Sequence, residues 1–461
     1  MHYLSTRGGI QPVRFKDAVM MGLADDGGLL LPESIPVVSS EELESWRSLS
    51  YPELAFAIIS RFVDDIPAAD LKELINRSYA TFSHPQVTPV VRQDGVYILE
   101  LFHGVTLAFK DVALQFLGNL FEYILHERNE RLTIVGATSG DTGSAAIHGV
   151  RGKDGISIFI LHPHGKTSLV QALQMTSVLD ENVHNIAVDG TFDDCQDIVK
   201  ALMGDLQFKQ QYSLGAVNSI NWARVLAQVV YYVYAWLQVA QKDEKVVFSV
   251  PTGNFGDIFA GFVAWQMGLP IARLLLATNE NNILTRWVQD GDYSVGEVVQ
   301  TVSPSMDIQV ASNFERYLYY LFGCDSGRVR AAFAQLKTEG RISFSADELQ
   351  QLQQVFSSAS VNRTQTLETI KAFKQETGYL LDPHTAVGVR AAQQMVADGM
   401  PVICLATAHP AKFGDAVAEA TGEAVPVPAS IARLEGLPTR CERMAADLEQ
   451  VRQFVIARAG L

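Results

Sequence analysis

Residues Leu101–Phe116 read LFHGVTLAFKDVALQF and hold a single lysine, Lys110, within largely apolar sequence. From Asp111 onward the apolar residues recur at helical spacing, which predicts a helix that begins near Lys110. Asp111 would lie in its first turn, where a carboxylate interacts favourably with the helix dipole. A lysine shielded from water has a lowered pKa, and its free amine can form a Schiff base with an aldehyde or ketone. The alternative is a surface lysine whose stem covers apolar groups, and this stretch alone favours the alternative.

The composition limits the class of protein. The chain has 461 residues, enough for two or three domains, and 48% of them are hydrophobic. Its formal net charge of −15 argues against general binding to nucleic acid or to anionic membranes. The four cysteines lack CxxC spacing, so we expect neither a disulfide framework nor a metal site. Because no signal-peptide segment and no apolar run of membrane-spanning length occurs, we expect a cytoplasmic protein.

The order of apolar and helical segments predicts two regions. Residues 1–86 are expected to form a mainly helical N-terminal domain, and residues 196–240 and 313–376 are also expected to be helical. After residue 87, short apolar runs alternate with helical segments, which is typical of an α/β fold with a mostly parallel sheet. The strands expected there are Tyr97–Leu101, Leu132–Ala137, Ile156–Leu161, Asn185–Val188, Val246–Val250, Arg273–Ala277 and Val402–Leu405.

Two loops that follow expected strands have the composition of anion-binding sites. Thr138–Gly143 (TSGDTG) supplies two glycines and three hydroxyls, and Thr252–Gly256 (TGNFG) supplies two more glycines. We expect these glycines to adopt positive φ angles that turn several N–H groups inward, with a helix N-terminus behind them. Each loop taken alone could equally be a structural turn. Neither matches GxGxxG or GxxxxGK[ST], which removes most support for nicotinamide or ATP cofactors.

A third segment, Asn218–Arg224 (NSINWAR), combines two amides, a hydroxyl and a guanidinium. These groups suit a phosphate or carboxylate, although the segment could also be a helix start with Ser219 or Asn221 as its N-cap. A lysine in apolar sequence, two anion-binding loops and an α/β sheet together suggest pyridoxal phosphate, an aldehyde cofactor that carries a phosphate. The protein would supply the lysine, a phosphate site and a partner for the ring nitrogen.

Motifs along nearly the whole chain resemble the threonine synthase family, in particular its branch with an extended N-terminal domain. They occur in that family's order: HGVTLAFKD, GATSGDTGSAA, GTFDDCQ, NSINWAR, PTGNFGD, MDIQVASNFER, LDPHTAVG and ATAHPAKF. The resemblance implies a fold-type II pyridoxal-phosphate enzyme, related to tryptophan synthase β. Its catalytic core would span residues 87–461 in two αβα lobes with open, mostly parallel sheets, the smaller lobe at about residues 130–200.

The resemblance also implies roles for individual residues. The cofactor would be held by Lys110, Asp141, Thr252, Gly253, Asn254, Phe255, Gly256 and Thr407. The substrate would be held by Thr138, Ser139 and Thr142 at its carboxylate and by Asn218, Ser219 and Arg224 at its phosphate. Lys110 would be the catalytic residue, and the Thr407 hydroxyl would face the ring nitrogen. Many relatives have an asparagine in place of Asp141 that donates to the phenolic oxygen of the cofactor, and a carboxylate there cannot donate unless it is protonated.

The implied reaction is the last step of threonine biosynthesis, in which O-phospho-L-homoserine and water give L-threonine and phosphate. Three alternatives remain: a phospho-lyase that stops at 2-oxobutanoate, a serine/threonine dehydratase, and a relative without catalytic activity. Retention of Lys110, the Thr252–Gly256 loop and Thr407 argues against the last. The implied partner is the small-molecule substrate, without nucleic acid or membrane, and the chain would be a monomer or a homodimer.

Overall fold

The computed structural model describes residues 1–393 and 399–459. The larger of its sheets contains β3 (Val90–Gln93), β4 (Val96–Glu100), β9 (Val246–Pro251), β10 (Ile271–Thr278), β13 (Phe356–Ser360) and β14 (Val402–Ala406). Their order is β13-β10-β9-β14-β4-β3; β3 pairs antiparallel with β4, and the other pairs are parallel. The strands other than β3 run the same way, so the loops at their carboxyl ends gather at one edge.

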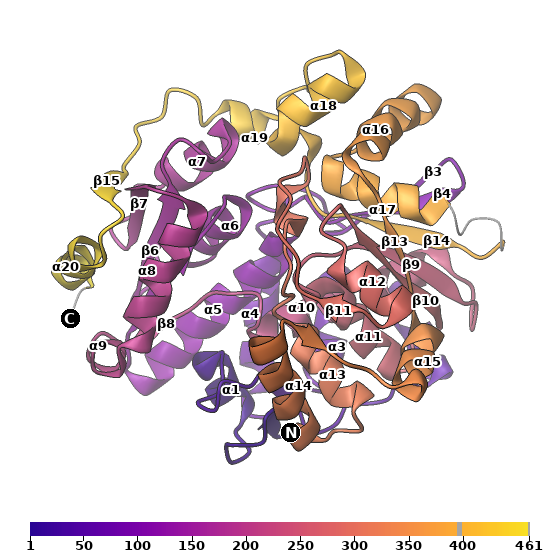
Figure 1. The fold of residues 1–461 in the computed structure, drawn as a ribbon, viewed down its shortest axis with the longest axis horizontal. Helices are drawn as coiled ribbons and strands as arrows, with labels where there is room; N and C mark the ends of the chain where they lie inside the picture. The colour runs from indigo at the N-terminus through magenta and orange to yellow at the C-terminus, as the bar shows by residue number, and fades with distance from the viewer. Residues whose placement is uncertain (394–398, 460–461) are drawn as a thin grey trace.

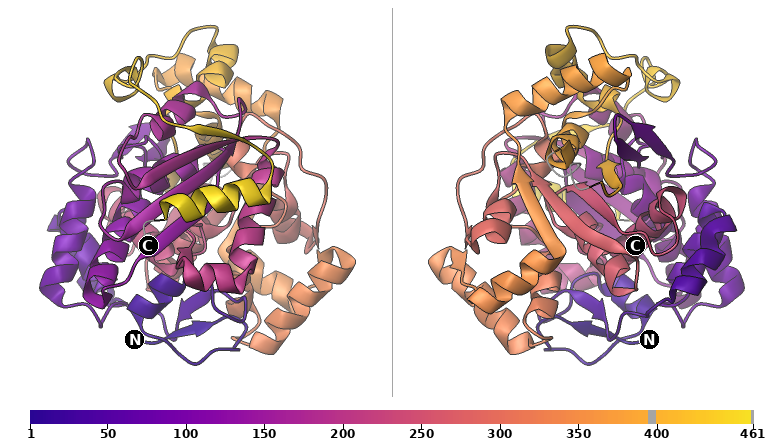
Figure 2. Two further views of the ribbon diagram at one scale, coloured as in Figure 1. Left: turned by 90° about the vertical axis from the view of Figure 1, so that its left-hand side faces the viewer. Right: turned by 90° about the vertical axis from the view of Figure 1, so that its right-hand side faces the viewer.

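The second sheet contains β5 (Leu132–Ala137), β6 (Ile156–Pro163), β7 (Val183–Asp189), β8 (Leu214–Gly215) and β15 (Glu442–Ala445). Its order is β15-β7-β6-β5-β8, and all of its pairs are parallel. Helix α20 (Leu448–Arg458) lies across this sheet, as the left view of Figure 2 shows, and buries Val451 and Val455 against it. The two mostly parallel sheets confirm the predicted α/β fold with two sheet-containing lobes (Figure 1).

The N-terminal region combines helices with one small strand pair. Its elements are β1 (Tyr3–Ser5), α1 (Phe15–Met21), β2 (Leu30–Pro32), α2 (Ser40–Ser45), η1 (Trp46–Ser48), α3 (Tyr51–Ile59) and α4 (Ala68–Tyr79). The following helices up to the middle of the chain are α5 (Lys110–Arg128), α6 (Asp141–Val150), α7 (Leu169–Thr176), α8 (Phe192–Gly204), α9 (Leu206–Gln211), α10 (Trp222–Val239), α11 (Gly256–Gln266) and α12 (Ile283–Asp290).

The remaining elements follow α12 and extend to the C-terminal part of the chain. They are β11 (Tyr293–Ser294), η2 (Pro304–Met306), α13 (Phe314–Leu321), α14 (Ser326–Glu339), β12 (Arg341–Ile342), α15 (Ala346–Val355), α16 (Arg363–Thr377), α17 (Pro383–Gln393), η4 (Pro410–Phe413), α18 (Gly414–Thr421) and α19 (Ala429–Ala432). No helix in the described ranges is long and apolar enough to cross a bilayer.

Helix α10 lies in the core of the molecule. Its residues from Trp222 to Leu237 are buried, and it contacts α3, α5 and α11. A helix that is apolar on nearly all faces is stable only where other elements cover it, and α1, η1 and β3 also contact α10. Helix α5 begins at Lys110, as predicted, and ends at Asn129, whose left-handed backbone closes the helix.

The structure corrects several sequence-based expectations. Residues 196–240 are not continuously helical, because β8 and a loop separate α9 from α10. Residues 313–376 contain β12 and the edge strand β13, whose sequence FSSAS lacks the apolar run of a central strand. Asn221, one of two candidate N-caps, is the N-cap of α10: its side chain accepts from the Ala223 amide.

Candidate functional site

The Lys110 segment, the Thr407 segment and the Thr252–Gly256 loop lie at the same edge of the larger sheet. They follow β4, β14 and β9, which are neighbours in that sheet. The Phe109 amide donates to the Thr407 carbonyl at 2.8 Å, and the His409 amide donates to the Leu107 carbonyl at 3.0 Å. These two hydrogen bonds fix the lysine segment against the segment that follows β14.

Lys110 is nearly buried, with 11% of its side chain exposed. Its Nζ lies 3.7 Å from Asp141 Oδ2 and 5.1 Å from the centre of the Phe109 ring. Burial lowers the pKa of Lys110; the Asp141 carboxylate opposes this, whereas the cations of Lys412 and Arg224 add to it. A lysine in this setting has an amine that is easily deprotonated and can act as a nucleophile.

Asp111 does not act as an exposed partner of the helix dipole. It is fully buried and accepts hydrogen bonds from the Thr106 amide and the Thr106 hydroxyl, both at 2.8 Å. Burial raises the pKa of Asp111 to about 6. The carboxylate therefore ties together the loop that precedes Lys110, and the expectation of a simple dipole contact was incomplete.

The Thr252–Gly256 loop is an open cluster of backbone donors. The amides of Gly253, Asn254, Phe255 and Gly256 donate to no acceptor within the described ranges, and Gly256 begins α11. Free amides at the N-terminus of a helix attract an anion, because they add hydrogen bonds to the positive end of the helix dipole. The loop therefore fits a phosphate group.

The positive φ in this loop belongs to Phe255 and not to a glycine, so the expectation of positive-φ glycines is wrong for this loop. In the Thr138–Gly143 loop it is confirmed for Gly140, which has φ 145°. Phe255 has φ 63°, and its buried ring packs on Trp287, Phe314, Tyr317 and Phe356. A left-handed non-glycine residue costs about 1–3 kcal/mol, and here the aromatic packing offsets this cost. Gly253 is required for another reason: a Cβ there would lie 2.9 Å from the Ser305 carbonyl oxygen.

We predict that Gly253→Ala weakens cofactor binding. The new Cβ would push the loop away from the Ser305 carbonyl and displace its amides, at a cost of about 1–3 kcal/mol, which corresponds to a roughly tenfold or larger rise in the dissociation constant. Cofactor titration checks this. Gly204→Ala is the matched control, because a Cβ at Gly204 meets nothing within 4 Å. An unchanged dissociation constant in Gly253→Ala would show that the loop is only a structural turn.

Arg224 is a buried guanidinium without a partner for two of its groups. The residue is 3% exposed, and neither Nε nor Nη1 has a hydrogen-bond partner in the described part of the chain. Burial lowers the pKa of Arg224 to about 10. Leaving a buried charge unpaired is costly, so this side chain is suited to bind an anion that arrives from solution. In the same segment Ser219 is half-buried and Asn218 is exposed.

Ser312 and Asn313 connect the Arg224 segment to the Thr252–Gly256 loop. Ser312 Oγ lies 2.9 Å from Ser219 Oγ and donates to Asn254 Oδ1 at 3.1 Å. The Asn313 amide donates to the Asn254 carbonyl, and its side-chain amide donates to the Ser219 carbonyl. The sequence alone indicates no role for the MDIQVASNFER motif, and these contacts supply one: the motif holds the two candidate anion-binding segments together.

The hydroxyls of the Thr138–Gly143 loop divide into two groups. Thr138 is buried, and its Oγ1 accepts from the amides of Gly140 and Gly143, at 3.0 and 2.9 Å. Ser139 and Thr142 are more exposed, and their hydroxyls make no hydrogen bond within the described ranges. Ser139 and Thr142 are therefore the hydroxyls available to a ligand, whereas Thr138 shapes the loop.

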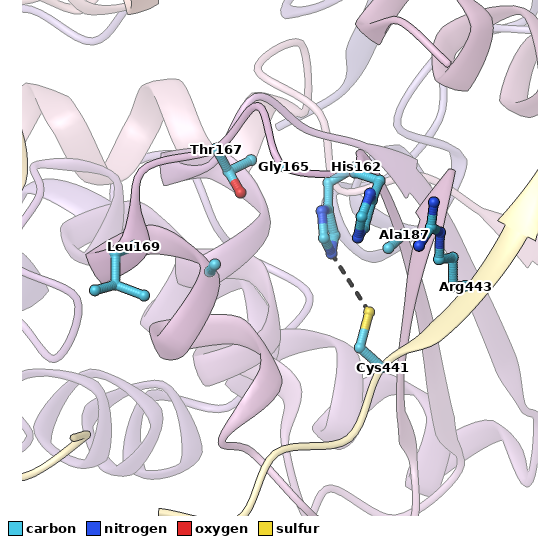
Figure 3. A pocket seen from close by; sticks show the side chains of 9 residues that line it. His162, Gly165, Thr167, Leu169, Ala187, Cys441 and Arg443 are labelled. Carbon is cyan, nitrogen blue, oxygen red and sulfur yellow. Dashed lines mark hydrogen bonds between the residues drawn. The ribbon is translucent and has the colours of Figure 1, made fainter. Parts of the chain in front are cut away.

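A hollow of about 430 Å³ lies elsewhere, beside β15 and α7 (Figure 3). It is lined by residues such as His162, Thr167, Leu169 and Arg443, and by Cys441, whose Sγ lies 3.7 Å from His162 Nε2. None of its lining residues belongs to the anion-binding segments or to the lysine segment. It is separate from the candidate site.

Comparison with known proteins agrees with this geometry. Family models match in sequence order: the threonine synthase N terminus at residues 2–79, the pyridoxal-phosphate dependent enzyme family at residues 82–407, and the threonine synthase C-terminal family at residues 385–455. The threonine synthase of Pseudomonas aeruginosa is 47% identical over 99% of this chain and 98% of its own length. The chain belongs to the threonine synthase family.

Solved threonine synthase structures share the complete fold. A crystal structure of pyridoxal-phosphate-bound threonine synthase from Brucella melitensis has a TM-score of 0.98 and 46% identity, and covers 100% of both chains. The structure of the yeast threonine synthase has a TM-score of 0.95 and 45% identity over 99% of this chain and 98% of that one. This member of the family is thus a fold-type II, pyridoxal-phosphate-dependent enzyme, and its buried lysine and free loop amides fit the cofactor.

Proposed function

We propose that the chain converts O-phospho-L-homoserine and water into L-threonine and inorganic phosphate. Arg224 carries this proposal. In the described part of the chain, two groups of its buried guanidinium have no partner, and its segment is linked through Ser312 and Asn313 to the loop whose amides have none there either. Such a pair of anion receivers suits an enzyme whose cofactor and substrate both bear phosphate. A serine/threonine dehydratase has no substrate phosphate to bind.

We assign the two phosphates according to the kind of donor. The loop Thr252–Gly256 offers backbone amides in a fixed arrangement, which suits the phosphate of a permanently bound cofactor. Arg224, with Asn218 and Ser219, offers side chains that can take up a phosphate and release it again. The remaining assignments are Ser139 and Thr142 for the substrate carboxylate, with Thr138 shaping their loop, Lys110 and Asp141 beside the reacting end of the cofactor, and Thr407 for its ring nitrogen.

Individual residues of the protein would then have the following roles in the reaction. Pyridoxal phosphate supplies, when bound, an electron sink for the pair left at Cα. Lys110 would take the proton from Cα and then one from Cβ, so that the electron pair left at Cβ can expel phosphate from Cγ. It would return these protons to Cα and Cγ, a task that its lowered pKa favours. Arg224 receives the phosphate that leaves from Cγ, and a water molecule adds at Cβ to give threonine.

Substrate choice tests the proposal. The cofactor-loaded protein is expected to release phosphate from O-phospho-L-homoserine and to form almost no keto acid from L-threonine or L-serine. Malachite-green detection of phosphate and a coupled assay for keto acids measure both. Deamination of L-threonine or L-serine without phosphate release from O-phospho-L-homoserine would identify a dehydratase instead.

We also propose a boundary at about residue 86 between the N-terminal domain and the catalytic core. It is supported by the gap between the matched segments 2–79 and 82–407. The smaller lobe would begin at about residue 130, and the structure adds β15 and α20 to its sheet and core. We propose that the enzyme acts in the cytoplasm as a monomer or homodimer.

A further inference from the structure

Asp141 lies between two buried lysines. Its Oδ2 is 3.7 Å from Lys110 Nζ, and its Oδ1 is 3.1 Å from Lys412 Nζ. The side chain of Lys412 is 0% exposed and that of Asp141 is 5% exposed. The sequence motif ATAHPAKF contains Lys412, but no role follows from the motif itself. The structure therefore places a second lysine, Lys412, near Lys110, with the Asp141 carboxylate between the two.

Lys412 is held by two hydrogen bonds and one ion pair. Its Nζ donates to the Thr106 carbonyl at 2.7 Å and to Gln174 Oε1 at 2.8 Å. Asp141 Oδ1 lies at ion-pair distance, 3.1 Å from the same nitrogen. Within the described ranges, Asp141 is the carboxylate in ion-pair distance of Lys412. Since a buried ammonium is stable only when it is paired, the two charges compensate each other.

The contacts also fix the orientation of the Asp141 carboxylate. Gln171 Nε2 donates to Asp141 Oδ1 at 2.9 Å, so Oδ1 is occupied by both Gln171 and Lys412. Oδ2 is left facing Lys110. Gln171 and Gln174 both lie on α7, which belongs to the smaller lobe, whereas Lys412 lies on η4 next to the larger sheet. The carboxylate is thus clamped from both lobes on one oxygen and open toward Lys110 on the other.

We propose that Lys412 is a positioning residue that keeps Asp141 ionised, with Oδ2 directed at the Lys110 nitrogen, when Lys110 is occupied by the cofactor. The proposal rests on the assignment of Lys110 made above. In the absence of the cofactor, the Lys110 ammonium also balances Asp141. Once the Lys110 nitrogen is bound to the cofactor, its charge changes during the reaction. Lys412 is then the adjacent cation that keeps its charge, because its nitrogen does not react. Asp141 can then serve as an anion beside the Lys110 nitrogen throughout the reaction.

The charged groups around the pair agree with this role. Burial alone would raise the pKa of Asp141, but Lys412, and after it Lys110, hold it well below its usual range. His384 lies close enough to influence the charge of Asp141, and Lys412 in turn influences Asp111, His148 and His409. Without Lys412, burial would dominate in the cofactor-bound enzyme, and the Asp141 carboxyl would take up a proton in the neutral range.

The test compares absorbance spectra of the cofactor-bound enzyme from pH 5.5 to 9. The variants are Lys412→Met, Asp141→Asn, the double variant Lys412→Met/Asp141→Asn, and Lys153→Met as a matched control. Lys153 is a half-buried lysine that pairs with Glu122 and lies outside the site. We expect the absorbance of Lys412→Met to change with pH as one proton binds, a change that the wild type does not show between pH 5.5 and 9. We also expect its cofactor dissociation constant to be about tenfold higher at pH 8. Lys153→Met should match the wild type.

The double variant decides between a charge role and a packing role. We expect it to lose the pH-dependent change in absorbance and to recover most of the cofactor affinity, because a neutral asparagine needs no cation. If Lys412→Met does not fold and the double variant does, the proposal is also supported. It is overturned if Lys412→Met has the wild-type pH dependence, if the pH-dependent change persists in the double variant, or if the double variant recovers neither folding nor affinity. These readouts need no turnover, so they remain valid if the proposed reaction is wrong.

Discussion

Lys110→Ala is expected to abolish turnover and the visible absorbance of bound cofactor while the fold is retained. Lys110 would provide both the covalent attachment and the catalytic base, and loss of the base alone costs about 10²–10⁴-fold in rate. The fold should persist, because alanine favours the helix α5 and Asp141 keeps its ion pair with Lys412 at 3.1 Å. An absorbance spectrum, a threonine assay and circular dichroism measure the three effects.

Lys153→Ala is the matched control for this experiment. It removes a half-buried lysine that pairs with Glu122 at 3.2 Å, away from the three segments of the site. We expect it to keep the cofactor band and full activity. A Lys110→Ala protein that still showed the band and produced threonine would remove Lys110 from the mechanism.

Arg224→Met is expected to raise the Michaelis constant for O-phospho-L-homoserine and to leave cofactor binding unchanged. Loss of one charge-assisted contact weakens binding by about 1.5–3 kcal/mol, roughly ten- to a hundredfold. Product inhibition by inorganic phosphate should weaken in parallel. Because Arg224 Nε and Nη1 have no partners among the described residues, replacing the guanidinium by an apolar side chain should leave the free energy of unfolding unchanged or raise it.

Arg316 is the matched control for Arg224, because it is equally buried but satisfied. Its guanidinium donates to the carbonyls of Leu30 and Ile220 and to the Asn313 side chain. Arg316→Met should therefore lower the free energy of unfolding by about 1–3 kcal/mol. Loss of the cofactor in Arg224→Met, with unchanged phosphate inhibition, would mean that the two phosphate sites have been assigned in the wrong order.

The parts of the fold that follow from local sequence could be predicted. Buried parallel strands such as β5 and β9 are continuous apolar runs, and α5 begins at the residue where helical spacing begins. Edge strands do not have this signal. β13 has a mixed burial pattern, and β15 (ERMA) is largely exposed, so neither could be distinguished from a loop by its hydrophobicity.

In the candidate site, too, local sequence predicts some features and not others. Composition was sufficient to propose the anion-binding segments and Lys110 as candidates, because glycines, hydroxyls and a lysine in apolar sequence are local features. The left-handed backbone of Phe255 depends on packing by residues far along the chain, and the burial of Lys412 depends on α7 and η4 meeting. Contacts of this kind are tertiary, so no single segment predicts them.

The products formed from O-phospho-L-homoserine test the proposed function most directly. The cofactor-loaded enzyme is incubated with this substrate, and threonine, inorganic phosphate and 2-oxobutanoate are quantified in the same samples over time. Threonine synthesis requires water to add at Cβ after phosphate leaves, so we predict equal amounts of threonine and phosphate with little 2-oxobutanoate. Phosphate accompanied by an equal amount of 2-oxobutanoate, with no threonine, would contradict the proposal and identify a phospho-lyase.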